Sequence, residues 1–197
     1  PQPVPANLDW DMYCGPAPFR PFNKKIHPLG HRHFLDFANG QLGDWGINWI
    51  DQALWITEAK HPKTVFSTGG RPIKGAPINT SQEQTTDAPD HQLATFQFEQ
   101  FDVSWEHRMF AGNNAEKGES VGCYFYGEKG TVFVTDARWS FTPRGKGAVR
   151  QTHDAKSDMG GLHMAEFLDA VRQRKPAPCS IADAHLSTTT VKLGTIA

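Results

Sequence analysis

The sequence predicts an α+β fold with an open, mostly antiparallel β-sheet and helices packed on one face of it. Strand-like runs follow one another from about residue 64 to residue 142 with no helix between them, so the crossovers that parallel strands need are missing. Helical repeats precede and follow this region. With 197 residues and 38% hydrophobic content, the chain can bury one core, and we expect a single domain.

Residues 1–40 are expected to form an irregular arm of this domain, with the sheet and helices over residues 41–197. Four prolines, Pro16, Pro18, Pro21 and Pro28, are too closely spaced for a long helix. A disordered linker would lack apolar surface, whereas this segment has enough aromatic side chains to pack on a neighbour. They are Trp10, Tyr13, Phe19, Phe22, Phe34 and Phe37.

A helix is predicted from Gly43 to about Glu58. Ile47, Ile50 and Leu54 recur at offsets of three and four, which places them on one buried face. Another stripe of the same helix is polar but includes a tryptophan, and its first carboxylate lies where free backbone donors are available. The stripe contains Asp44, Asn48, Asp51 and Trp55.

Six strands and two closing helices complete the expected fold. The strands cover residues 64–68, 93–98, 103–109, 121–126, 131–136 and 138–142. The closing helices run from about Gly161 to Arg174 and from Ser180 to the last residues. We expect the first to bury Met164, Phe167, Leu168 and Val171, and the second to pack through Ala182, Leu186, Thr189, Leu193 and Ile196.

The stretch between Gly69 and Gln92 has few apolar residues and several helix and strand breakers. Loops of this length are usually functional or mobile. Because it has no aromatic anchor, we expect a mobile surface loop rather than a lid.

Composition excludes several classes of partner. The 20 Lys and Arg balance 21 Asp and Glu, so no broad field attracts nucleic acid or an anionic membrane. No apolar run approaches the roughly 20 residues of a membrane helix. Cys14, Cys123 and Cys179 are far apart and predict free thiols, and we expect no metal at His31 and His33.

Several catalytic motifs are missing from the chain. A dinucleotide site needs a glycine-rich GxGxxG turn between a strand and a helix, which is absent, so we expect no cofactor on this chain alone. No GxSxG motif or protease-type cysteine is present. Paired carboxylates among Asp36, Asp44 and Asp51 leave glycosidase chemistry open.

The segment FANGQLGDWGINWIDQALW, residues 37–55, resembles the stretch GGGxLxDxGxHxxDxxxW in the C-terminal domain of the Gfo/Idh/MocA oxidoreductases. The preceding LDWDMYCGPAPFRPFN resembles the arm LDWDLWLGPAPxRPYN of a subgroup common in planctomycete and Bacteroidetes genomes. Residues 163–197 resemble the closing helices of that subgroup. The matches follow in order over nearly the whole chain.

This resemblance implies the C-terminal half of a two-domain enzyme for a sugar, sugar derivative or cyclitol. The implied Rossmann domain is absent here; it would hold NAD or NADP and supply a lysine that assists proton transfer. The C-terminal half, which this chain represents, would carry the substrate pocket on the helix-covered face of an open sheet. The other face would join subunits into a homodimer or homotetramer.

The resemblance also assigns the candidate catalytic residues, Asp44 and Asn48. Asp44 matches the aspartate that orients the substrate or the family's histidine. Asn48 stands where the family has that acid-base histidine, and an amide cannot exchange a proton near neutral pH, although it donates and accepts hydrogen bonds. The candidate substrate-binding residues, whose alternative role is structural, are Arg20, Asn23, Arg32, Asp36 and Asp51.

Three functions therefore remain open from the sequence. The first is the substrate-binding and oligomerisation domain of an NAD(P)-dependent oxidoreductase. The second is a relative that uses NAD to cleave glycosides, and the third is a carbohydrate-binding or oligomerisation module without catalysis.

Overall fold

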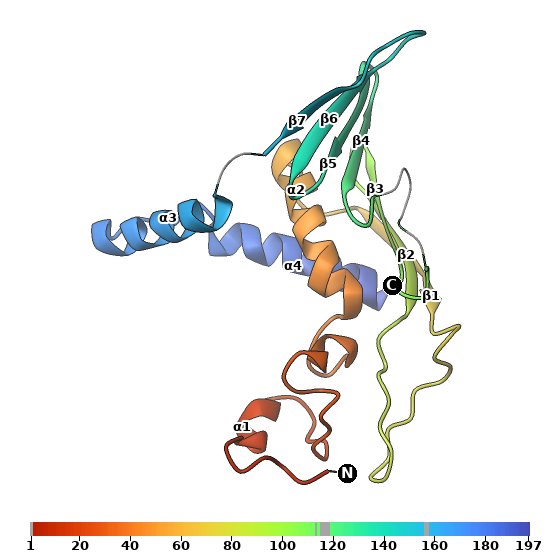
Figure 1. Cartoon of the computed structure of the whole chain (residues 1–197), viewed down its shortest axis with the longest axis vertical. Coiled ribbons are helices and arrows are strands. Elements are labelled where there is room, and N and C mark those ends of the chain that lie inside the picture. Colours follow the sequence, from red (N-terminus) through yellow and green to blue (C-terminus); the bar gives the residue numbers. More distant parts are fainter. Residues whose placement is uncertain (1, 113, 115–118, 156–157) are drawn as a thin grey trace. The chain divides into compact units, whose positions relative to one another are not determined.

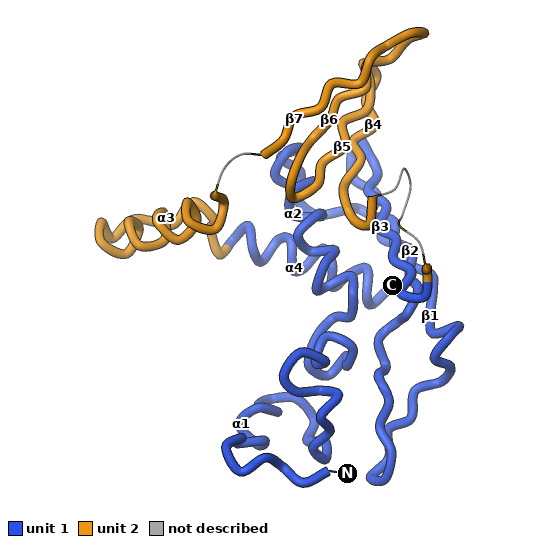
Figure 2. The backbone as a smooth tube through the Cα atoms, in the orientation of Figure 1, with its two compact units in different colours: residues 1–110, 182–197 blue, residues 111–181 orange. Residues whose placement is uncertain are grey.

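The computed structural model describes residues 2–112, 114, 119–155 and 158–197. It divides into two compact units, of which unit 1 comprises Pro1–Phe110 and Ala182–Ala197, and unit 2 comprises Ala111–Ile181 (Figure 2). Its elements form an α+β fold, as predicted, and all paired strands are antiparallel. Within the described ranges, no helix has the length and apolar character to cross a membrane.

A three-stranded sheet in the order β1-β2-β3 lies at the centre of unit 1. Its strands are Thr64–Gly70, His91–Gln97 and Asp102–Arg108. Burial alternates along β2, where Gln92, Ala94 and Phe96 are buried and their neighbours are more exposed. This alternation is that of a sheet covered on one face only.

Helices α2 (Ile47–Thr57) and α4 (Ile181–Ile196) cover that face, and Figure 1 shows both on the same side of the sheet. Ile50 and Leu54 are buried and Ile47 packs against them, which confirms the predicted face of the first helix. The core cluster consists of Leu42, Ile50, Leu54, Ala94, Phe96, Phe98 and Val191.

The predicted packing stripe of α4 is largely wrong, although Leu186 packs against the core as expected. The buried residues are Ser187, Thr190, Val191 and Gly194, a face made mainly of small side chains. A Cβ atom on Gly194 would lie 2.7 Å from Cζ of Phe96, so the helix approaches the sheet too closely for larger residues. Hydrophobicity alone therefore predicted the wrong stripe, because the close packing of α4 on the sheet requires small side chains.

The arm carries two short helices, α1 (Trp10–Cys14) and η1 (Gly30–His33), joined by irregular chain. It has a small core of its own, since Trp10 stacks on Tyr13 with ring centroids 5.0 Å apart and donates its indole N–H to the carbonyl of Arg20. The buried cluster comprises Trp10, Cys14, Phe22, Ile26 and Phe34. The arm aromatics therefore pack largely on one another.

The long stretch between β1 and β2 is bonded to the arm, which differs from the free surface loop we expected. The backbone N–H groups of Asp87 and Ala88 both donate to the carbonyl of His33, at 3.0 and 3.1 Å. The side chain of Asn23 donates to the carbonyl of Gln84 at 3.4 Å. Hydrogen bonds to backbone groups thus hold this stretch against the arm, although it has no aromatic residue that could anchor it.

Unit 2 contains a four-stranded sheet in the order β4-β5-β6-β7. The predicted turn between Gly127 and Gly130 is confirmed, because these two residues pair across β4 and β5. The last strand was not predicted, because its sequence Gln-Thr-His-Asp is polar and has no apolar alternation; all four residues are exposed. The strands are Cys123–Gly127, Gly130–Val134, Arg138–Pro143 and Gln151–Asp154.

Helix α3 (Met159–Gln173) begins as predicted, with Asp158 accepting a hydrogen bond from the backbone N–H of Gly161 at 2.9 Å. The other predicted cap, Ser157, lies outside the described residues. The predicted buried face is wrong, because no residue of α3 is buried within the described chain. The four side chains of the predicted face are exposed by 40% to 56%, and they are Met164, Phe167, Leu168 and Val171.

Candidate functional site

The predicted catalytic residues lie where a short π-helical turn, η2 (Leu42–Gly46), leads into α2. Gly46 permits this turn, because a Cβ atom there would lie 2.8 Å from Cδ1 of Leu42 and 3.3 Å from the indole of Trp105. Leu42, the first residue of the turn, is fully buried. Such π turns occur frequently at functional sites, and here the turn is fixed to the sheet by packing.

Asp44 protrudes from this turn and forms an ion pair with Arg32 of η1. The Oδ2 atom of Asp44 lies 3.1 Å from Nη1 of Arg32, and both side chains are partly exposed. The structure thus brings together one predicted catalytic residue and one predicted substrate-binding residue. A carboxylate held in this way can accept a hydroxyl hydrogen bond while its charge is balanced.

Asn48 lies one turn further along α2 and is exposed. Its Nδ2 donates to the backbone carbonyl of Asp44 at 3.3 Å, a long hydrogen bond. The amide oxygen and the second N–H are not used in this contact, so they can bond a ligand hydroxyl. The group can position a hydroxyl but cannot take its proton.

Asp51 is on the same stripe but serves a different contact. Its carboxylate accepts a hydrogen bond from the hydroxyl of Ser187, which lies on the buried face of α4. Asp51 therefore links the two helices that cover the sheet. Its predicted contact with a substrate stays a prediction.

Arg20 and Asp36 are brought together in the arm, where Arg20 is buried and Asp36 is exposed. The guanidinium of Arg20 is 5% exposed and donates to Asp36 at 2.7 Å and to Asp87 at 3.0 Å. Asp87 also accepts the backbone N–H of Leu35 at 2.6 Å. This network joins the arm to the stretch before β2. Arg20 and Asp36 thus have a structural role, which was the alternative to substrate binding.

Asn23 also holds the arm. Besides its contact with Gln84, its side-chain oxygen accepts the backbone N–H of Lys25 at 2.9 Å. Of the five candidate substrate-binding residues, only Arg32 contacts a candidate catalytic residue within the described chain. The candidate site is therefore smaller than the sequence suggested, with Arg32, Asp44 and Asn48 at its centre.

Two residues near this centre were not predicted as site residues. His33 follows Arg32, and the charges that act on it include those of Asp44 and of Lys74 from the stretch after β1. Burial lowers the pKa of His33, and the positive charges of Lys74, Arg32 and His31 lower it further, against the opposing effect of Asp44. The imidazole is therefore largely neutral at neutral pH. No sequence signal indicates that the charge of Lys74, about 40 positions away, acts on His33.

Metal and thiol chemistry find little support in the described parts of the chain. No group of three or more His, Cys, Asp or Glu side chains could hold a metal ion there. Burial raises the pKa of the Cys123 thiol to about 11, so it stays protonated at neutral pH. The thiolate that nucleophilic catalysis requires is not available at this residue.

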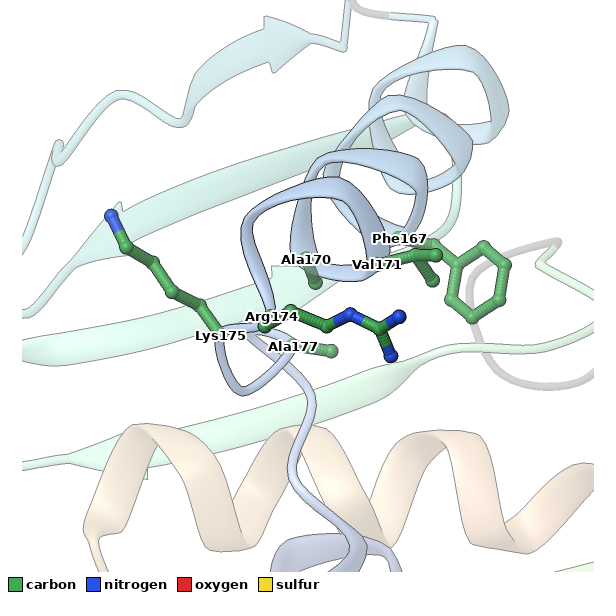
Figure 3. A pocket seen from close by; sticks show the side chains of 6 residues that line it. All are labelled: Phe167, Ala170, Val171, Arg174, Lys175 and Ala177. Atoms are coloured by element: carbon green, nitrogen blue, oxygen red, sulfur yellow. The ribbon is translucent and has the colours of Figure 1, made fainter.

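A shallow hollow of about 330 Å³ lies at the C-terminal end of α3 in unit 2. Figure 3 shows the guanidinium of Arg174 pointing to the same side as Phe167 and Val171, whereas Lys175 extends away from them. None of the predicted site residues lines this hollow. We do not assign the candidate site to it.

Comparison with known families decides what kind of domain this is. The profile described as "Oxidoreductase family, C-terminal alpha/beta domain" matches residues 1–197. The chain belongs to the Gfo/Idh/MocA oxidoreductase family. The resemblance seen in the sequence is thus confirmed for the whole chain.

Solved structures with the Gfo/Idh/MocA fold agree with this assignment at low identity. UDP-N-acetylglucosamine 3-dehydrogenase of Acidithiobacillus ferrooxidans is 14% identical with a TM-score of 0.60, and the match covers 90% of this chain and 50% of that chain. A protein of Erwinia carotovora atroseptica assigned as an oxidoreductase is 16% identical with a TM-score of 0.62, covering 84% and 49%. At such identities the likeness shows the fold alone.

The Gfo/Idh/MocA domain described here spans about half the length of the solved structures that it matches. One of them, from Desulfitobacterium hafniense and assigned as NADPH-dependent, is 13% identical with a TM-score of 0.58; the match covers 84% of this chain and 48% of that one. None of the curated proteins matches the chain in sequence.

The described residues do not fit a dinucleotide. Every pair of strands is antiparallel, so the βαβ unit that presents a helix N-terminus to a pyrophosphate is missing from the described chain. The glycine pairs at Gly69 and Gly160 do not have the GxGxxG spacing. What this Gfo/Idh/MocA chain offers at the candidate site is a set of polar groups, on Arg32, Asp44 and Asn48.

Proposed function

We propose that the chain is the substrate-binding and subunit-association domain of an NAD(P)-dependent oxidoreductase acting on a sugar, sugar derivative or cyclitol. The observation that carries this proposal is the Arg32–Asp44 ion pair beside Asn48, at the turn that packs on the sheet through Gly46. Membership of an oxidoreductase family supports the reaction class. The sugar-nucleotide dehydrogenase among the structural neighbours is consistent with a carbohydrate.

In this proposal, each residue of the centre has a binding task. Asp44 accepts a hydrogen bond from a substrate hydroxyl, and Arg32 holds its carboxylate in position. Asn48 bonds the neighbouring hydroxyl through an amide that can both donate and accept. NAD or NADP would be held by a part of the protein other than this chain. A group other than Asn48 would accept the proton of the reacting hydroxyl.

A second proposal is suggested by the same asparagine. Because an amide in the family's histidine position removes a general acid or base, the domain would bind its carbohydrate without turning it over. Asp44 and Asp51 are each engaged with another side chain, so a glycosidase pair draws less support from the geometry.

We also propose that the protein is a homodimer or homotetramer assembled through the open face of its sheet. One face of β4–β6 carries six apolar side chains that are at most partly buried. They are Cys123, Phe125, Val132, Val134, Trp139 and Phe141. A continuous apolar face of this kind supports association with a second copy.

The deciding experiment joins the chain to the nucleotide-binding half of its parent protein and follows nicotinamide absorbance over a panel of sugars. The variants are the natural protein, Asn48→His, and Trp55→His as a control that adds a histidine at an exposed position of the same helix. A general acid or base contributes about 10²- to 10⁴-fold, so we expect Asn48→His to gain at least about a hundredfold. The control should gain nothing.

The outcomes separate the proposals. Cofactor reduction by the natural protein or by Asn48→His supports the oxidoreductase. Silence from all three variants, with sugar binding retained, overturns it in favour of a binding domain. Release of an aglycone without net cofactor change would indicate glycoside cleavage instead.

A further inference from the structure

Trp45 is an exposed tryptophan directly beside the candidate site. It follows Asp44 in the turn η2 and is 45% exposed. Tryptophan is usually well buried, because its indole is a large apolar ring. Trp10 of the arm shows this ordinary state, with 4% exposure. Sites for small molecules combine apolar and aromatic surfaces with a few polar groups, and an indole next to Asp44 has that combination.

The backbone that carries Trp45 is held on both sides. Leu42, three residues before it, is fully buried. Gly46, the next residue, lies so close to Trp105 that a Cβ atom there would be 3.3 Å from the indole of Trp105. The indole of Trp45 is therefore attached to a turn that the core fixes. A ligand can bind a surface of this kind at a low cost in conformational entropy.

The side chain of Asn48 lies against the same turn. Its Nδ2 atom is 3.3 Å from the carbonyl oxygen of Asp44, and this carbonyl belongs to the peptide bond between Asp44 and Trp45. Residues three and four positions apart are neighbours on a helix surface, so Asn48 is a neighbour of both. A carboxylate, an amide and an indole thus gather within one helical turn, with Arg32 paired to the carboxylate at 3.1 Å.

Trp55, on the same helix, provides a comparison. It is 79% exposed, more than Trp45. It lies seven residues after Asn48, however, which is two helical turns or about 10 Å along the helix axis. A single ring that bonds Asp44 and Asn48 is therefore adjacent to Trp45 and further from Trp55. Position, and not exposure alone, distinguishes the two tryptophans.

We propose that the indole of Trp45 is a stacking surface for the substrate, and that the site takes a sugar or cyclitol ring with an unbroken face of C–H groups. This inference rests on the proposed function and specifies its substrate class. When every hydroxyl of such a ring is equatorial, the axial C–H bonds make both faces apolar. The hydroxyls then lie at the edge of the ring, where Asp44 and Asn48 bond them.

An axial hydroxyl on the stacked face disrupts this arrangement. It points at the carbon atoms of the indole, which offer no strong hydrogen-bond acceptor, and a hydroxyl removed from water without a partner costs free energy. Stereoisomers with the same composition and charge should therefore differ in affinity. In scyllo-inositol all hydroxyls are equatorial, whereas D-chiro-inositol has an axial hydroxyl on each face. This pair of cyclitols tests the stacking whichever face meets Trp45.

The experiment uses the 197-residue chain and three probes: scyllo-inositol, D-chiro-inositol and glucose. NMR titration gives the dissociation constants and follows the indole N–H signal of Trp45, which is assigned by its loss in Trp45→Phe. Neither readout depends on catalysis.

The variants separate stacking from other roles of the side chain. Trp45→Leu keeps an apolar side chain without a flat ring, and Trp45→Phe keeps a flat ring. Trp55→Leu, which removes the more exposed indole of the same helix, is the matched control. Asn48→Ala reports independently on the bonds to the hydroxyls.

We expect scyllo-inositol and glucose to bind about tenfold more tightly than D-chiro-inositol, and to shift the indole signal of Trp45. Trp45→Leu should lose about tenfold in affinity for scyllo-inositol. Trp45→Phe should keep most of the affinity, and Trp55→Leu should keep all of it. If Trp45→Leu does not fold, the two inositols and the indole signal of the natural chain decide.

Equal affinities for the two inositols, or an unchanged affinity in folded Trp45→Leu, overturn this inference. If Asn48→Ala still loses affinity in that case, the proposed function stands. Equal losses in Trp45→Leu and Trp45→Phe also overturn the inference, because the flat ring would then contribute nothing. Binding of none of the probes overturns it as well, while cofactor reduction with another sugar would still support the proposed function.

Discussion

The indole N–H of Trp105 donates to Nδ1 of His107 at 3.0 Å, and Nε2 of His107 lies 3.3 Å from the carbonyl of Pro89. This pair of contacts fixes His107 as a neutral ring that accepts at Nδ1 and donates at Nε2. The same indole packs beside Gly46, in the turn that carries Asp44. A buried histidine on β3 is therefore linked by two contacts to the candidate site.

This arrangement predicts that the protein loses stability in mild acid. Burial lowers the pKa of His107 and the nearby charge of His91 lowers it further, while the Pro89 carbonyl, Asp90 and Glu106 act in the opposite direction. The unfolded chain thus binds a proton more readily than the folded one. The stabilisation is complete above the ordinary histidine pKa of about 6.5 and is lost as pH falls through the lowered pKa of the folded state.

Urea unfolding at about pH 7.5 and about pH 5.5 measures this loss on either side of the histidine range. In His107→Gln, the difference in unfolding free energy between the two pH values should shrink. The exposed residue His61 gives the control, and His61→Gln should keep the natural difference. An unchanged difference in His107→Gln would show that other groups carry the pH dependence.

Gly194→Ala should destabilise unit 1 although alanine favours helices. The added Cβ would lie 2.7 Å from Cζ of Phe96 and 2.9 Å from Cδ2 of Leu42, both fully buried side chains. Overpacking costs about 1 to 3 kcal/mol, against a gain of about 1 kcal/mol in helix propensity, so we expect a net loss of about 1 kcal/mol. Chemical denaturation gives the value.

The matched control for this glycine is Gly160→Ala in α3. There the added Cβ would meet only Oδ1 of Asp158, at 3.7 Å, an ordinary contact. We expect this variant to be as stable as the natural protein or slightly more stable. If Gly194→Ala behaved in the same way, α4 would not approach the sheet as closely as described.

Arg20→Met should be among the more damaging substitutions in the arm. It leaves the carboxylates of Asp36 and Asp87 without their cation, in a place where the arginine side chain is only 6% exposed. Breaking a buried pair from one side typically costs about 3 to 5 kcal/mol, and the partial exposure of Asp36 places our expectation near about 3 kcal/mol.

The exposed pair of Arg172 with Asp169 on α3 supplies the comparison, since both side chains are more than half exposed. Arg172→Met should change the unfolding free energy by less than about 1 kcal/mol. Similar losses for the two arginines would contradict the structural role of Arg20. Loss of the stabilisation that added ligand gives the natural protein would instead support a contact of Arg20 with substrate.

The contacts of Arg20 show why local relationships could be predicted from the sequence and distant ones could not. Periodicity placed Ile50 and Leu54 correctly, and the DxGxH-like motif placed Asp44 beside Asn48, because these relationships are local. The partner Asp87 lies 67 positions after Arg20, and no local pattern links them. The small residues of α4 gave no hydrophobic repeat for its true buried face.

The open face of β4–β6 gives the last prediction. Phe125, Val132 and Phe141 are cross-strand neighbours on that face, and each is partly exposed. If copies of the chain associate there, Val132→Lys places a charge in the middle of an apolar interface and should convert the oligomer to a monomer. Sedimentation velocity measures the mass directly. Thr142→Lys puts the same charge on an exposed position of the opposite face of β6, and it should leave the mass unchanged. A natural protein that sediments as a monomer would contradict subunit association, and an oligomer that survives Val132→Lys would place the association on another surface.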